Sequence, residues 1–129
     1  MERTARAFTT AYAGHDARDG GDRTYADAGV RAAKHAAGEL AEVLRQQRPG
    51  QDGAWAELRS EKAVRTAQIK TVVTPDGAPA ADESSAVVRV GYTLTTTPAS
   101  GATRTSSEQI ALRMEHTASG WRVVALPWS

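Results

Sequence analysis

The chain has 129 residues, with 16 Lys and Arg against 15 Asp and Glu, so its net charge is +1 at neutral pH. This length predicts one domain, residues 1–129, because it supplies one proper core and not two. The balanced charge gives no electrostatic reason to expect a nucleic-acid or anionic-membrane partner. The lack of cysteine excludes disulfides, thiolate metal sites and cysteine nucleophiles.

Membrane and export signals are weak in this chain. No apolar run approaches the roughly 20 residues that a membrane-spanning helix needs. The opening residues 1–6 carry charges with no apolar segment behind them, so a signal peptide is not predicted. This start suits either a natural N-terminus or a chain whose membrane anchor lies upstream.

The N-terminal segment has helical periodicity. This predicts an amphipathic helix over residues 4–19. Asp19-Gly20-Gly21 is expected to end it, because glycine adopts the left-handed conformation favoured at a helix C-terminus. The apolar and aromatic positions of this helix are Ala5, Phe8, Ala11, Tyr12 and His15.

A second helical region follows. It is predicted to begin near Thr24, which with Asp27 resembles a capping box. Gly38 is unfavourable in a helix by about 1 kcal/mol relative to Ala, so a break there would leave a short helix over residues 39–47. A further helical turn is predicted over residues 54–58, so the helices occupy residues 4–58 or so.

From residue 63 onward the period changes to two, which predicts strands up to about residue 127. A strand over residues 63–74 ends at the turn Pro75-Asp76-Gly77. Three more strands are then expected between Ala86 and Ser129, closed by a tight turn at Ser119-Gly120. They carry Val88–Thr95, Ile110–Thr117 and Trp121–Leu126. Helices followed by an antiparallel meander predict an α+β fold.

Two histidine–carboxylate pairs have the spacing of one helical turn. His15 and Asp19 stand at metal-ligand spacing in the predicted first helix. We favour Asp19 as a helix-end residue, because two glycines follow it directly. His35 and Glu39 have the same spacing, but Gly38 lies between them, so we interpret them as an exposed face. No metal or cofactor site is therefore predicted.

Known catalytic and nucleotide-binding motifs are missing. There is no Gly-x-Ser-x-Gly, no Gly-x-Gly-x-x-Gly and no P-loop. His116 alternates with apolar residues and so faces inward at the end of a pocket or forms a hydrogen-bonded edge residue. The arginines Arg89, Arg104, Arg113 and Arg122 are expected on the outer sheet face, diluted by Glu108 and Glu115. That pattern favours a solvated face over nucleic-acid binding.

The three tryptophans are the largest apolar side chains. Trp55 and Trp121 are expected to pack in the core. Trp128, next to the chain end, is left open between core and contact surface, since an exposed tryptophan there would indicate a docking site.

The layout resembles the nuclear transport factor 2-like (cystatin-like) superfamily, in which a strongly curved sheet wraps the first helix to form a cone-shaped α+β roll. The resemblance implies that the N-terminal helices pack inside such a sheet. It rests on Phe8, Ala11, Tyr12, Asp16 and Gly120-Trp121-Arg122-Val123-Val124.

Two branches of this superfamily compete. The branch typified by ketosteroid isomerases and polyketide cyclases implies a general base and an oxyanion donor inside the cone. The residues that could line such a pocket are Tyr12, His15, Asp16, Tyr92 and His116. The other branch comprises extracytoplasmic domains of membrane-anchored proteins, including assembly factors of type IV secretion and conjugation channels. These are interaction modules without an active site.

We favour the second branch. The Ala-, Arg-, Gly- and Thr-rich composition resembles that of actinobacterial proteins, in which such anchored domains are common. The resemblance then implies no catalytic residue, no cofactor, and protein partners or self-association. The expected location is the extracytoplasmic face of the cell membrane, with a cytoplasmic location as the alternative. Arg89, Arg113 and Trp128 are the expected interaction residues.

Overall fold

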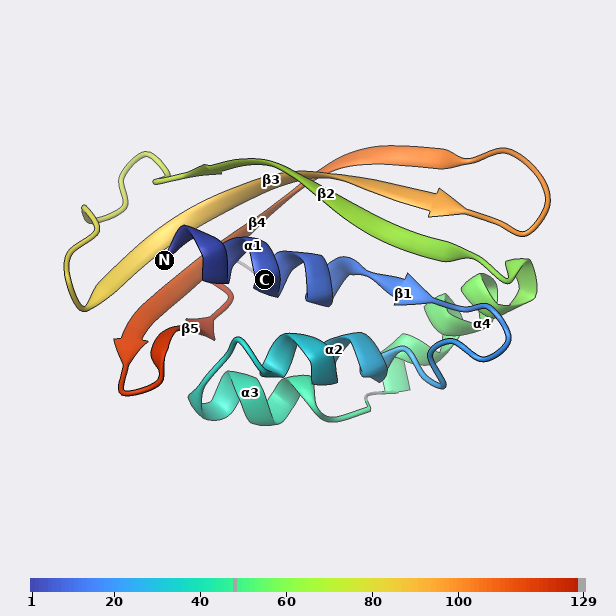
Figure 1. The fold of residues 1–129 in the computed structure, drawn as a ribbon, viewed down its shortest axis with the longest axis horizontal. Coiled ribbons are helices and arrows are strands. Elements are labelled where there is room, and N and C mark those ends of the chain that lie inside the picture. Colours follow the sequence, from blue (N-terminus) through green and yellow to red (C-terminus); the bar gives the residue numbers. More distant parts are fainter. Residues whose placement is uncertain (48, 128–129) are drawn as a thin grey trace.

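The computed structural model describes residues 1–47 and 49–127 and has an α+β fold. Helices α1, α2 and α3 lie on one side of a curled antiparallel sheet (Figure 1). The described elements are α1 (Glu2–Ala13), β1 (His15–Asp16), α2 (Ala26–Ala33), α3 (Gly38–Leu44), the 3-10 turn η1 (Pro49–Gln51), α4 (Asp52–Glu61), β2 (Val64–Val73), β3 (Ser85–Thr97), β4 (Arg104–Thr117) and β5 (Gly120–Ala125). The predicted fold class is confirmed.

The first helix is shorter than predicted. It ends at Ala13, and Gly14 adopts an extended backbone with φ −83° and ψ 138°. His15 and Asp16 then pair antiparallel with the start of β2. A Cβ at position 14 would lie 2.9 Å from the carbonyl oxygen of Thr10, so glycine lets the chain leave the helix tightly against its last turn. The prediction that Asp19-Gly20-Gly21 ends this helix was therefore wrong.

The second helical region is interrupted where the sequence indicated. α2 ends at Ala33, and α3 begins at Gly38, whose φ of +66° is a conformation that glycine adopts without strain. Thr24 acts differently from the predicted cap. The Asp27 carboxylate accepts hydrogen bonds from the Thr24 hydroxyl at 3.0 Å and from the Arg23 backbone N–H at 2.8 Å. The single turn expected near Trp55 is a full helix, α4.

The strands are ordered β1-β2-β3-β4-β5, and every neighbouring pair is antiparallel. Their register places Val88 opposite Leu112 and Ala86 opposite Met114, on the face that α1 covers. This face forms the main core with small helix residues. The largest fully buried side chains are Phe8, Thr9, Val88, Val90, Leu112, Met114 and Val123.

A close approach of α2 to α3 depends on Gly29. A Cβ at this position would overlap the carbonyl oxygen of Leu44. We expect Gly29→Ala to lower the free energy of unfolding by about 1–3 kcal/mol, because the two helices must move apart to admit the methyl group. Urea unfolding followed by tryptophan fluorescence measures this change.

Gly53 in α4 provides the matched control, because a Cβ there would meet no heavy atom within 4 Å. Gly53→Ala is expected to keep stability unchanged or raise it by up to about 1 kcal/mol, since alanine is the better helix former. A Gly29→Ala protein as stable as Gly53→Ala would contradict the packing argument.

Candidate functional site

A buried histidine on the inner side of the fold stacks on one of the three tyrosines. We call Tyr12, His15, Tyr25 and Tyr92 the aromatic cluster. The His15 ring stacks on Tyr25 with ring centroids 4.1 Å apart. The pKa of Tyr92 is raised by burial and then by the charges of Glu108, Tyr12 and Tyr25. The Tyr92 hydroxyl on β3 is thus influenced by residues of α1 and of the segment before α2.

His15 is only 5% exposed, and neither ring nitrogen has a hydrogen-bond partner among the described residues. Burial, followed by the positive charge of Arg65, lowers its pKa to about 4, and Arg31 acts in the same direction. Asp22 and the Ala13 carbonyl raise this pKa by smaller amounts, although neither forms a well-shaped hydrogen bond with the ring. The imidazole is therefore neutral at physiological pH and cannot donate a proton to solvent directly.

The carboxylate beside His15 does not form an acid–base pair with it. Asp16 and His15 are successive strand residues, whose side chains point to opposite faces. Arg18 donates two side-chain hydrogen bonds to Asp16, at 2.8 and 2.9 Å, and these lower the Asp16 pKa to about 2. Asp16 is thus an ionised carboxylate that holds the turn after β1.

Arg31 fixes the chain around this cluster from the other side. It donates to the Asp22 carboxylate at 2.6 and 3.0 Å and to the Gly14 carbonyl at 3.0 Å. These contacts tie the segment between α1 and α2 to α2 itself. Arg31 and Arg65 are the two cations whose charges act on the uncharged His15 ring.

The residues proposed for an enzymatic pocket do not all line the cavity that opens between the helices. A cavity of about 170 Å³ opens between the helices and includes Tyr12, but not His15, Asp16, Tyr92 or His116. Its walls carry hydroxyl, amide and apolar groups and no carboxylate or imidazole. The cavity is lined by Tyr12, Tyr25, Gly29, Val43, Leu44 and Gln51.

His116 lies far from that cavity, near the β4–β5 turn. It is exposed, and its ring sits 5.4 Å from that of Trp121. Its backbone N–H donates to the Ser84 carbonyl at 2.9 Å. Of the two interpretations of His116, the structure matches the edge residue.

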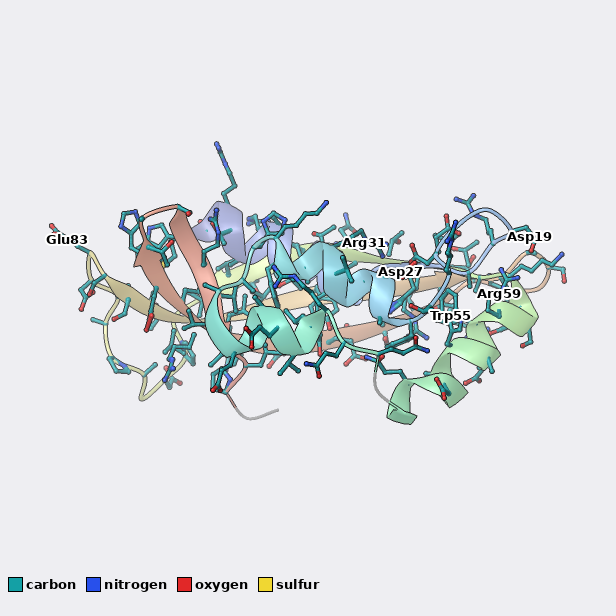
Figure 2. The ribbon with its side chains drawn as sticks, turned by 90° about the horizontal axis from the view of Figure 1, so that it is seen from below. Asp19, Asp27, Arg31, Trp55, Arg59 and Glu83 are labelled. Atoms are coloured by element: carbon teal, nitrogen blue, oxygen red, sulfur yellow. The ribbon has the colours of Figure 1, made fainter. Side chains whose placement is uncertain are left out.

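The prediction that each of the two histidine–carboxylate pairs lies on one helix was wrong. Asp19 belongs to the loop after β1, where it accepts hydrogen bonds from Arg59 at 3.3 Å and Lys62 at 3.2 Å. Figure 2 shows Asp19 and Arg59 at the same end of the molecule. His35 follows α2, whereas Glu39 belongs to α3, so they do not share a helix. Within residues 1–47 and 49–127, no three His, Asp or Glu side chains are placed to hold a metal ion.

Trp55 and Trp121 pack as partly buried anchors. Trp55 packs against the small cluster of Ala17, Leu58 and Ala63, which joins α4 to the rest of the fold. Trp121 packs against the main core. The predicted contact residue Trp128 lies outside the described residues.

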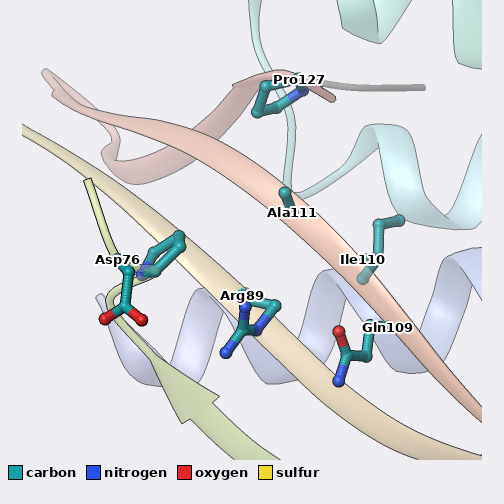
Figure 3. Close-up of a pocket in the computed structure, with 7 residues that line it drawn as sticks. Asp76, Arg89, Gln109, Ile110, Ala111 and Pro127 are labelled. Carbon is teal, nitrogen blue, oxygen red and sulfur yellow. The ribbon is translucent and has the colours of Figure 1, made fainter. Parts of the chain in front are cut away.

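Arg89 and Arg113 lie on the outer sheet face, as expected, because their strand neighbours Val88 and Leu112 face the core. Arg89 lines a hollow of about 390 Å³ on the outer sheet face, together with Asp76, Gln109 and Pro127 (Figure 3). Arg113 lines a separate hollow near Pro79.

The prediction that Arg104 lies on the outer face was wrong. Arg104 lies on the inner face, because it stands opposite Thr96, which is buried there. It instead forms a two-pronged ion pair with Glu61 of α4, at 2.8 and 2.9 Å. Glu108 was likewise misplaced. It stands opposite Tyr92 and raises the Tyr92 pKa from the inner face.

A free sheet edge runs along residues Arg104–Gln109 of β4. Strand β5 has 6 residues against 14 in β4, and it pairs only with the part from Arg113 to Thr117. Among the described strands, residues 104–109 therefore pair with β3 alone, and all six residues are exposed. In Figure 1, no described segment runs beside this edge. The sequence holds no clear signal for this edge, because its periodicity predicts the strand only from Ile110 onward.

The opposite edge of the sheet is protected in two ways. β2 pairs with β1 only at Val64 and Arg65, but α1 packs along it. A register shift between Ile69 and Thr71 leaves Lys70 in a bulge. Bulges and lysines block further strand pairing. The Arg104–Gln109 edge has neither a bulge nor a proline.

None of the described helices combines the length and apolar composition that a membrane-spanning segment needs. No family model and no curated protein match the chain. Two solved structures show a distant likeness. The intermembrane-space region of the chloroplast protein ARC6 has 13% identity and a TM-score of 0.41, over 71% of this chain and 70% of that one. A putative calcium/calmodulin-dependent protein kinase II association domain from Xanthomonas campestris has 14% identity and a TM-score of 0.45, over 99% and 84%. At these values neither likeness assigns a family or a function.

Proposed function

We propose that this chain is a non-catalytic interaction and assembly module that binds a protein partner by strand pairing along Arg104–Gln109. The observation that carries the proposal is the exposed edge of β4, which has a paired strand on one side only. Unpaired backbone N–H and C=O groups form a template for an added strand.

The inner face beside this edge supports the same function. Tyr92, Leu94 and Ile110 lie on this face next to the edge and are only partly buried. An added strand would cover these side chains further, because every second residue of such a strand points to the inner face. The enzymatic alternative has less support, since no carboxylate or imidazole lines the cavity between the helices.

The setting of this module remains the one that the family resemblance implies. We propose the extracytoplasmic soluble domain of a membrane-anchored bacterial protein, in a conjugation or secretion channel. The support is the resemblance of residues Phe8–Asp16 and Gly120–Val124 to the nuclear transport factor 2-like superfamily, together with the composition. A cytoplasmic binding protein is the alternative setting.

Site-specific photo-crosslinking in the cells that make the protein tests the proposed function. Benzoylphenylalanine at Ser107 is expected to capture a protein, which mass spectrometry identifies. The same probe at Thr93 is the matched control, because Thr93 pairs with Ser107 but lies one strand further inside the sheet. The captured protein, once purified, should slow hydrogen exchange of the amides of residues 104–109 at least tenfold. Equal capture from both positions, or no capture from either, would contradict the proposal.

A further inference from the structure

We infer that the strand added to β4 is β4 of a second copy of this chain, in a two-fold antiparallel pairing centred on Ser106. This inference rests on the proposed function and names its partner. It follows from the register that symmetry allows along the exposed edge and from the charges at Arg104 and Glu108.

Symmetry restricts the register of such a pairing. A two-fold axis perpendicular to the sheet keeps each residue on the same face in both copies. Residues that face each other across the two strands must therefore both be odd-numbered or both even-numbered, and a single residue must lie at the centre. Centring on Ser106 places Arg104 of one copy opposite Glu108 of the other, twice. Centring on Thr105 or Ser107 places Arg104 opposite Ser106 or Ile110 and leaves the charges unmatched.

The charges fit this register. Glu108 is exposed and has no ion-pair partner in the described part of the chain. Arg104 is also exposed, and its bonds to Glu61 use its two terminal nitrogens once each. A guanidinium has five N–H donors, so it can bind a second carboxylate as well. Opposite charges directly across two strands stabilise the pairing, and like charges destabilise it.

The remaining positions also fit. On the outer face, Thr105 stands opposite Ser107 of the other copy, a pairing of hydroxyl side chains that is favourable in antiparallel sheets. The two Ser106 side chains meet at the axis and are small enough to avoid a clash. The pairing is short and lies at the low end of specific interfaces, so the dimer is expected to be weak and concentration-dependent.

A single-cysteine trap tests the register directly, because the chain contains no cysteine. Position 106 faces itself across the axis at a Cα separation of about 4.5–5.5 Å, which a disulfide spans. Positions 105 and 107 would each be about 8 Å from themselves, too far for a disulfide. Ser106→Cys is therefore expected to form a covalent dimer under mild oxidation at least tenfold faster than Thr105→Cys or Ser107→Cys. All three positions are exposed, so they are matched controls.

Two charge variants test the pairing independently. Arg104→Glu and Glu108→Arg each place like charges opposite one another and are expected to weaken self-association at least tenfold in sedimentation equilibrium. Mixed in equal amounts, they restore both opposite-charge pairs, and the mixture is expected to dimerise as the parent chain does. Glu61→Gln is the control, because it removes the partner of Arg104 within the chain and leaves the proposed pairing intact.

The outcomes separate this inference from the proposed function. Equal trapping at 105, 106 and 107, no trapping at 106, or no recovery on mixing would overturn the two-fold pairing. If the Ser107 photo-probe then captures a different protein, the proposed interaction module is retained, and only the inference that its partner is a second copy is overturned. If the probe captures no protein at all, both conclusions fall.

Discussion

Replacing Phe8 with alanine is expected to lower the free energy of unfolding by about 3–5 kcal/mol. Phe8 is 0% exposed and is the only phenylalanine of the chain. It stacks on Tyr12 with ring centroids 5.6 Å apart and lies in the core between α1 and the sheet. Its loss removes apolar contacts and leaves a cavity.

The surroundings of Phe8 make that cavity hard to fill. The helix residues that share its core are mostly alanines, which include Ala5, Ala32 and Ala33. Alanine has no side-chain torsion by which it could move into the space. The loss in free energy of unfolding of Phe8→Ala is therefore expected toward the upper end of the range of about 3–5 kcal/mol.

Urea unfolding followed by tryptophan fluorescence measures this loss. Phe8→Leu retains most of the volume and is expected to lose less than about 1.5 kcal/mol. Thr10→Ala, an exposed position on the same helix, is expected to change stability by less than about 0.5 kcal/mol. A Phe8→Ala loss no greater than that of Phe8→Leu would show that the core does not depend on this ring.

Acidification from pH 6.5 to pH 4 is expected to destabilise the protein through His15. The folded pKa of His15 is lowered from 6.5 to about 4, so over this range the unfolded chain binds a proton that the folded chain does not. The free energy of unfolding therefore falls as the pH falls, and above pH 6.5 His15 makes no pH-dependent contribution. The full effect is on the order of 3 kcal/mol.

The loss of stability on acidification follows from the charged residues on each side of His15. Protonation would bury a cation between Arg65 of β2 and Arg31 of α2, while Asp22 opposes this only in part. His35 has a lowered pKa as well, caused first by burial and then by Arg122, so it adds a contribution of the same sign. Comparison of single variants is therefore needed to isolate His15.

Urea unfolding of the parent chain and His15→Phe at several pH values between 4.5 and 7.5 makes this comparison. Phenylalanine keeps the stack on Tyr25 and cannot be protonated, so its stability is expected to fall much less on acidification. His116→Phe, at an exposed position, is the control and should keep the parent's pH dependence. Parallel pH profiles for the parent and His15→Phe would contradict a buried neutral histidine.

Local chemistry accounts for most elements of the fold. The period of two from residue 63 predicts the strands that form β2 to β5, because side chains of an antiparallel sheet alternate between core and solvent. The break at Gly38 also appears where the sequence indicates it. These features depend on neighbours a few residues away, so they can be inferred without knowledge of the fold.

Long-range contacts account for the errors. The sequence predicts His15 on a helix, but the backbone of β2 offers hydrogen bonds to His15 and Asp16 and draws them into the sheet. Arg104 and Glu108 were assigned to the outer face, although their register against β3 places them on the inner face. Neither the pairing partner nor the curvature of a sheet is encoded in the spacing of one segment.

The candidate site also depends partly on local sequence and partly on long-range contacts. The residue types along Arg104–Gln109 can be read directly from the chain, but all six are polar and show no apolar alternation, so the strand is predicted only from Ile110 onward. Whether this strand is central or at an edge depends on where β5 stops, at Ala125 opposite Arg113. The register of β5 against β4 is a tertiary property, because it depends on hydrogen bonds between two strands, and among the described strands it leaves residues 104–109 paired on one side only.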